Sequence, residues 1–147
     1  MAVAPAISGK IRAVVINSMH GGFSLSPEAV RRMALLQGRP CYFFEGRSLH
    51  NSVRVAETEL QNHPGAYALD IPNPAEVKED EWSKHYISNR PDDRDDAILV
   101  QVVRELGARA NGQLAELKVI EIPADVDWYV DEYDGKEWVS EKHRRWR

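Results

Sequence analysis

The last third of the chain contains a strand–turn–strand pattern that strongly restricts how the chain can fold. Apolar and polar residues alternate over Leu117–Ile122, and two further strand-like segments follow at Asp127–Tyr133 and Lys136–Glu141. Asp134-Gly135, between the last two segments, is a dipeptide that two-residue β-hairpin turns prefer. The pattern therefore predicts an antiparallel meander at the C-terminal end.

Two amphipathic helices are predicted before this meander. Ser26 is a good N-cap, Pro27 suits the first helical position and Gly38 suits the end, so we expect a helix over Pro27–Gln37. A second helix is capped by Asp95 or Asp96 and extends toward Ala110. Its apolar face is formed by Ile98, Leu99, Val102, Val103 and Leu106.

The remaining elements complete an α+β fold. Ile11–Asn17 is rich in β-branched residues and predicts a central strand, and Cys41–Glu45 predicts another. Residues 46–93 carry four prolines and predict a variable insertion, β-rich or irregular, with a short strand near Tyr67–Ile71. We expect a single domain over residues 1–147, a mostly antiparallel sheet with the two main helices on one face.

Charge and cysteine content exclude several functional classes. The 147 residues carry 19 basic and 23 acidic side chains, a net charge of −4, which argues against a nucleic-acid-binding protein. Cys41 is the only cysteine and the histidines lack metal-like spacing, so we expect neither a metal nor another cofactor. Met1–Lys10 does not resemble a signal peptide and no apolar run reaches membrane length, so we expect no membrane partner and a cytoplasmic location.

One loop has the composition of an anion-binding site. It consists of His20, Gly21, Gly22, Phe23 and Ser24. It joins a predicted strand to a predicted helix start, where free N–H groups attract phosphate or carboxylate and glycines let a ligand approach the backbone. It matches neither a P-loop nor a dinucleotide-binding fingerprint. The alternative is a tight turn with Phe23 as a packing anchor.

The C-terminal segment is rich in aromatic residues. They are Trp128, Tyr129, Tyr133, Trp138 and Trp146. Trp128 and Tyr129 lie on opposite faces of one predicted strand, which indicates that both faces are covered, one by the core and the other by a partner, a ligand or the C-terminus. The alternative is cross-strand pairing within the meander. The acids of Glu121–Asp134 mark either a solvated face or a surface for a basic host protein.

Acidic and basic side chains follow one another at the end of the chain. Glu141 and His143 could serve as a general acid–base pair, which defines an enzyme as one alternative. A surface salt-bridge cluster is the other interpretation. Arg144 with Trp146 could hold a planar anionic ligand. Neither the motif of a serine hydrolase nor that of a metal enzyme is present, so the sequence favours a protein without catalytic activity.

Several segments resemble a family of small, largely uncharacterised phage and prophage proteins. The resemblance is carried by VIN at residues 15–17, GGFSLS at 21–26, VVxELGxxANG at 102–112, EIPxDVxW at 121–128, EYDGxEWV at 132–139 and HRxW at 143–146, where x marks a position outside the motif. It implies a compact accessory protein in the cytoplasm of a host cell, and no activity. Residues 46–93 do not take part in it.

These observations lead to three hypotheses. The first is a non-catalytic binding protein of phage type, for a small anionic, nucleotide-like molecule or for a host protein. Its anion site would combine the loop from His20 to Ser24 with Arg144 or a neighbouring basic residue such as His143. A ring from Tyr133, Trp138 or Trp146 would supply a stacking surface. The second is a small enzyme that uses Glu141 and His143. The third is a structural accessory protein, with a homo-oligomer left open.

Overall fold

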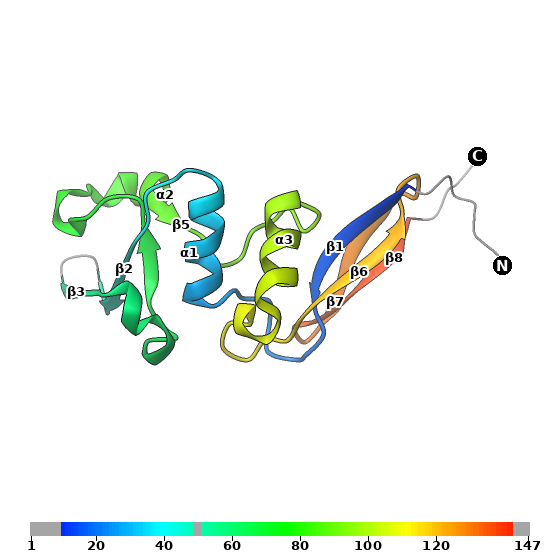
Figure 1. The fold of residues 1–147 in the computed structure, drawn as a ribbon, viewed down its shortest axis with the longest axis horizontal. Helices are drawn as coiled ribbons and strands as arrows, with labels where there is room; N and C mark the ends of the chain where they lie inside the picture. The colour runs from blue at the N-terminus through cyan, green and yellow to red at the C-terminus, as the bar shows by residue number, and fades with distance from the viewer. Residues whose placement is uncertain (1–9, 49–50, 143–147) are drawn as a thin grey trace.

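The computed structural model describes residues 10–48 and 51–142, which form an elongated α+β molecule. The strands form one four-stranded sheet and two two-stranded sheets. Figure 1 shows the larger sheet at one end, the helices α1 (Pro27–Leu36) and α3 (Ala97–Leu106) side by side in the middle, and the two smaller sheets at the other end. All ladders are antiparallel. The predicted α+β class is confirmed.

The first and last parts of the described chain meet at one end of the molecule. Strand β1 (Ile11–Asn17) pairs with β6 (Leu117–Pro123), and β7 (Trp128–Tyr133) pairs with β8 (Lys136–Glu141). β8 also contacts β1. The turn between β7 and β8 has φ of 51° at Asp134 and 85° at Gly135, as the dipeptide predicts for a tight hairpin. The hairpin is therefore confirmed.

The two central helices begin where their caps predict. α1 (Pro27–Leu36) starts after Ser26, whose Oγ accepts a hydrogen bond from the N–H of Ala29 at 3.1 Å. α3 (Ala97–Leu106) starts after Asp96, whose carboxylate accepts from the N–H of Leu99 at 3.0 Å. A 3₁₀ turn over Gly107–Ala110 continues α3 toward the expected end. The helices contact each other and form one hydrophobic core with both ends of the molecule.

The segment expected as an insertion is part of the core. β2 (Tyr42–Gly46), β3 (Ser52–Val55), β4 (Tyr67–Leu69) and β5 (Tyr86–Ile87) form one sheet in the order β3-β2-β4-β5. Short helical segments connect these strands at Glu57–Asn62, Pro74–Glu76, Glu79–Glu81 and α2, Trp82–His85. Phe43, Ala68 and Ile87 of this sheet are buried in the common core, so residues 46–93 complete the domain.

The sheet is divided in a way that the sequence did not predict. β6 pairs with β1 instead of β7, so the three C-terminal strands do not form one continuous meander, and the helices lie between two β layers. The physical reason is that β1 is buried on both faces. Val15 packs into the core with the helices. Val14 and Ile16 lie on the opposite face of β1, and they are buried because the hairpin covers that face.

A polar cluster ties α1 to the four-stranded sheet. Asp70, just after β4, accepts hydrogen bonds from Arg39 at 3.2 Å and His85 at 2.8 Å. Desolvation by itself would raise the pKa of Asp70, but the hydrogen bonds from His85 and Arg39 outweigh it and lower the pKa below the usual 3.8. Asp70 thus stabilises the folded state when it is ionised.

We expect this cluster to contribute to acid stability. Because the folded-state pKa of Asp70 lies below the unfolded one, its contribution is present above about pH 4 and disappears as the pH falls through the folded value. Melting temperatures measured from pH 7 to pH 2.5 should fall less steeply below pH 4 for Asp70→Asn than for the unmodified protein. Parallel curves for the two proteins would contradict the assignment, and Asp80→Asn, an exposed position, is the control.

Candidate functional site

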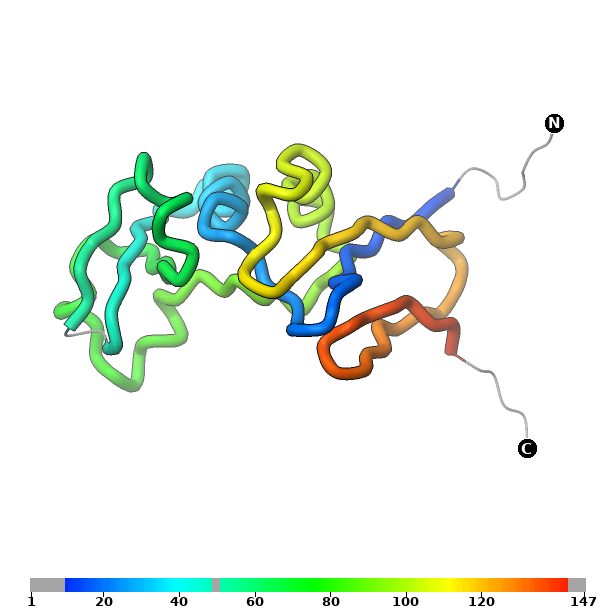
Figure 2. Tube along the Cα trace, turned by 90° about the horizontal axis from the view of Figure 1, so that it is seen from below, coloured from blue at the N-terminus to red at the C-terminus, as the bar shows by residue number. Residues whose placement is uncertain are grey.

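The predicted glycine loop packs against the tip of the C-terminal hairpin. A Cβ placed on Gly135 would lie 2.7 Å from the nitrogen of Gly21 and nearer still to that of Gly22. His20 Nδ1 lies 3.1 Å from the carbonyl oxygen of Asp134, and its ring meets Tyr133 edge-on at 6.4 Å. Figures 1 and 2 both show the loop after β1 beside the β7–β8 turn. The fold therefore brings together two segments that are remote in the sequence.

A largely buried ion pair anchors this contact. Arg94 donates to both oxygens of Glu137, at 2.6 and 2.9 Å, and the two side chains are only 16% and 9% exposed. The guanidinium also lies 3.7 Å from the centre of the Phe23 ring. A bidentate pair stacked on an aromatic ring fixes the arginine in one orientation. Phe23 thus anchors the loop by packing, as expected in the interpretation of the loop as a tight turn.

The same ion pair covers an edge of β1. The N–H of Val15 donates to the carbonyl of Arg94 at 2.8 Å, and the N–H of Asn17 donates to the Glu137 carboxylate at 2.8 Å. The fully buried side chain of Asn17 donates to the carbonyl oxygens of Met19 and Gly135 and accepts from the N–H of Glu116. These contacts occupy the polar groups of the loop region in structural roles.

The start of α1 differs from the expected anion site. Ser26 caps the helix, donates from its Oγ to the carbonyl of Arg109 at 2.6 Å and from its N–H to the carbonyl of Ala110. Glu28, in the first turn, forms an ion pair with Arg109. The helix N-terminus is therefore satisfied within the protein, because the 3₁₀ turn after α3 packs against it.

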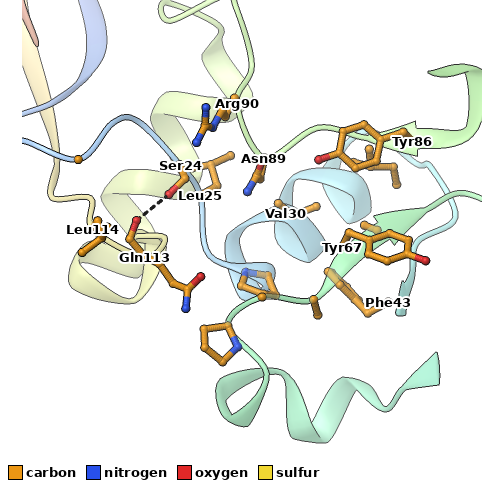
Figure 3. A pocket seen from close by; sticks show the side chains of 17 residues that line it. Ser24, Leu25, Val30, Phe43, Tyr67, Tyr86, Asn89, Arg90, Gln113 and Leu114 are labelled. Carbon is orange, nitrogen blue, oxygen red and sulfur yellow. Dashed lines mark hydrogen bonds between the residues drawn. The ribbon is translucent and has the colours of Figure 1, made fainter. Parts of the chain in front are cut away.

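A pocket of about 380 Å³ opens on the other side of the loop, between α1 and the four-stranded sheet. Gly21 and Ser24 line it from the loop, Tyr67 and Tyr86 from β4 and β5, and Arg90 from the segment before α3 (Figure 3). Ser24 is buried and its Oγ donates to the carbonyl of Gln113 at 3.3 Å. The volume falls in the range of about 300–1,000 Å³ that is typical of small-molecule sites.

The charged side chain that lines this pocket is positive. Among its described lining residues Arg90 is the only charged side chain, and no carboxylate takes part. Within the described parts of the chain, the guanidinium of Arg90, the side-chain amide of Asn89 and the hydroxyl of Tyr86 form no hydrogen bond. Figure 3 shows the Tyr86 hydroxyl pointing toward Asn89, with Arg90 above them. The pocket thus combines an arginine and neutral polar groups that are free to bind an anion.

Stacked aromatic rings support one wall of the pocket. Tyr86 stacks on Trp82 with ring centres 5.4 Å apart, and Trp82 meets Tyr67 edge-on at 5.6 Å. Tyr67 in turn packs against the buried ring of Phe44 at 5.9 Å. This chain of contacts restricts the rotamer of Tyr86, so its ring edge and hydroxyl are presented to the pocket in one orientation.

The structure places the predicted site residues in four groups. Gly21 and Ser24 line the pocket, whereas His20, Gly22 and Phe23 meet the hairpin or the core. Tyr133 and Trp138 lie on the hairpin and not in the pocket. His143, Arg144 and Trp146 lie outside the described residues, so the proposed contact of Arg144 with the loop stays a prediction.

Sequence reasoning missed the residues that give the pocket its chemistry. Tyr67, Tyr86, Asn89 and Arg90 all lie in the region expected as an insertion, where short strands leave little periodic signal. The turn-forming sequence Asn89-Arg90-Pro91 was a local signal that an arginine sits in a loop. No sequence pattern connects that loop to the glycine loop. The connection is a backbone hydrogen bond from Leu25 N–H to the carbonyl of Asn89, at 2.9 Å.

Two other candidate groups have no catalytic geometry in the described residues. Burial, reinforced by the charge of Glu57, raises the pKa of Cys41 to about 11, so the thiol stays protonated and unreactive at neutral pH. Glu141 is exposed at the end of β8, and the His143 expected to act with it lies outside the described residues.

Comparisons with known proteins do not add a family. No family model, curated protein or solved structure matches the chain. Among the helices of the described residues, none combines the length and apolar character needed to cross a bilayer.

Proposed function

We propose that the protein binds a small, planar, anionic molecule of nucleotide type in the pocket beside Arg90, and that it does so without catalysis. The observation that carries the proposal is the charge of the pocket. Among the described residues, one arginine without an acidic partner and no carboxylate line a cavity of ligand size. A guanidinium binds phosphate or carboxylate oxygens in a bidentate manner, and the edge of Tyr86 and the Asn89 amide can contact a base.

The net charge of the chain strengthens this argument. Because the whole molecule carries a net charge of −4, a general field would repel an anion, and any affinity for one has to come from a local group. Arg90 is such a group, because its guanidinium has no acidic partner among the described residues. A phage-type accessory protein that removes a nucleotide-derived signal in the cytoplasm of a host would need this kind of site. The resemblance to phage proteins agrees with that role.

Calorimetric titration with nucleoside monophosphates, diphosphates and the corresponding nucleosides tests the proposal. We expect saturable binding of a phosphorylated compound, no binding of its nucleoside, and a loss of affinity of about 10- to 100-fold for Arg90→Ala, since hydrogen bonds to charged groups contribute about 1.5–3 kcal/mol. Arg90→Lys should retain only part of the affinity of the unmodified protein, because an ammonium group cannot form a bidentate pair.

A matched control separates the pocket from general electrostatics. Arg54 is an exposed arginine outside the pocket, where it stacks on Tyr42. Arg54→Ala removes the same charge and should leave the affinity unchanged. Equal losses for both variants, or no saturable binding by any compound of the panel, would refute the proposal.

A further inference from the structure

The outer face of the C-terminal hairpin carries large aromatic side chains that the described residues leave uncovered. Tyr129, Tyr133 and Trp138 are 40%, 72% and 41% exposed. They share one face because Asp131 pairs with Trp138, Tyr133 pairs with Lys136, and side chains alternate along a strand. The opposite face is directed to β1, since Glu137 reaches Arg94 from it. The three rings thus form a surface that does not serve the core.

The hairpin is also strongly acidic. Residues 125–141 contain seven carboxylates and one lysine. Glu137 is paired with Arg94, and among the described residues none of the other carboxylates forms an ion pair with a lysine or arginine; Asp134 has the imidazole of His20 4.0 Å away. Asp131 lies between Tyr129 and Tyr133 on the aromatic face, and within residues 10–48 and 51–142 it forms no ion pair. Aromatic rings next to unneutralised carboxylates attract cations that have a flat, weakly hydrated surface.

We propose that this face, defined by Tyr129, Asp131, Tyr133 and Trp138, is a docking surface for an arginine-containing extended segment of a partner protein. The partner's guanidinium stacks on an aromatic ring and hydrogen-bonds to Asp131. The chain itself shows that these groups combine in this manner. Arg94 stacks on Phe23 and binds Glu137, and Arg54 lies 4.5 Å from the centre of the Tyr42 ring.

Charge selects this occupant over the others. The negative hairpin repels nucleic acid, whose backbone is anionic. It also disfavours a symmetric contact between the hairpins of two copies, because two acidic hairpins would meet. A basic segment is attracted at long range and then held by the rings at short range. This surface is separate from the pocket at Arg90 and does not depend on it.

Fluorescence anisotropy with a labelled ten-residue peptide of alternating arginine and glycine tests the inference. We expect saturable binding, a tenfold or greater loss of affinity for Trp138→Ala and for Asp131→Asn, and no binding of a peptide in which glutamate replaces arginine. A peptide in which lysine replaces arginine should bind more weakly than the arginine peptide, because a guanidinium stacks on an aromatic ring better than an ammonium group does. If Trp138→Ala perturbs the hairpin, Tyr133→Ala, at the most exposed ring, gives the same readout.

Two outcomes overturn the inference. Asp125→Asn removes one carboxylate from the turn before β7, outside the aromatic face. If it weakens peptide binding as much as Asp131→Asn does, the attraction is diffuse and no docking surface exists. If sedimentation shows a dimer that Trp138→Ala dissociates, the face is a contact between copies. An unchanged affinity for Arg90→Ala shows that the peptide does not bind at the pocket.

Discussion

Replacing Glu137 with alanine should lower the free energy of unfolding by about 3–5 kcal/mol, because it leaves Arg94 as an uncompensated, largely buried charge. The substitution also removes the acceptor for the Asn17 N–H, so β1 loses one of the backbone hydrogen bonds that it forms outside the β6 ladder. Urea titration followed by far-UV circular dichroism measures the change. A loss of this size in a domain of 147 residues removes much of its stability.

Two variants distinguish this effect from a general loss of charge. Glu141→Ala removes a carboxylate from the exposed end of the same strand and should change the stability by less than about 0.5 kcal/mol. In the double variant Arg94→Ala with Glu137→Ala, the cost should be smaller than the sum of the single costs, because the two groups interact directly. Additive costs would show that the ion pair does not connect the hairpin to the body.

The second large effect is expected for Gly135→Ala, at about 2–4 kcal/mol. Two penalties combine at this position. Its φ of 85° is unfavourable for a residue with a Cβ, and that Cβ would enter the backbone of Gly21 and Gly22, which cannot move without disturbing the loop. Thermal unfolding followed by calorimetry measures the combined cost.

Gly22→Ala separates the two penalties. Gly22 also has a positive φ, 98°, but a Cβ there meets nothing within 4 Å. It should therefore cost only about 1–2 kcal/mol, the backbone penalty alone. If Gly22→Ala and Gly135→Ala lower the free energy of unfolding equally, the tip of the hairpin does not pack closely against the glycine loop. The placement of the two segments side by side would then be wrong.

Local signals predicted the elements of this fold better than their arrangement. Ser26-Pro27 and Asp134-Gly135 act on the adjacent backbone, so the helix start and the hairpin were found where the structure has them. The pairing of β1 with β6 depends on which apolar faces meet, and neither strand contains that information alone. The same reason applies to residues 46–93. Their strands are only two to four residues long, so the sequence did not show that they pair with β2 and with one another in one sheet.

The candidate site shows the same division. The glycines at 21 and 22 were found because their chemistry is local, but their close packing against Gly135 of the hairpin was not foreseen, and of the two only Gly21 lines the pocket. Arg90 could not be distinguished from the other arginines by sequence, since what sets it apart is the absence of a described acidic neighbour. Arg94, four residues later, has that neighbour 43 positions away in Glu137.

The contact between Asn17 and Glu137 spans 120 positions, and it has a consequence for synthesis on the ribosome. β1 emerges early, with apolar side chains on both faces, but β6 and the hairpin that cover it are made more than a hundred residues later. During translation the strand has no native partner, and completing the domain requires closure of a long loop, which slows folding. Nascent chains arrested before Glu137 should therefore remain sensitive to protease at β1 and bind chaperones that recognise exposed apolar strands.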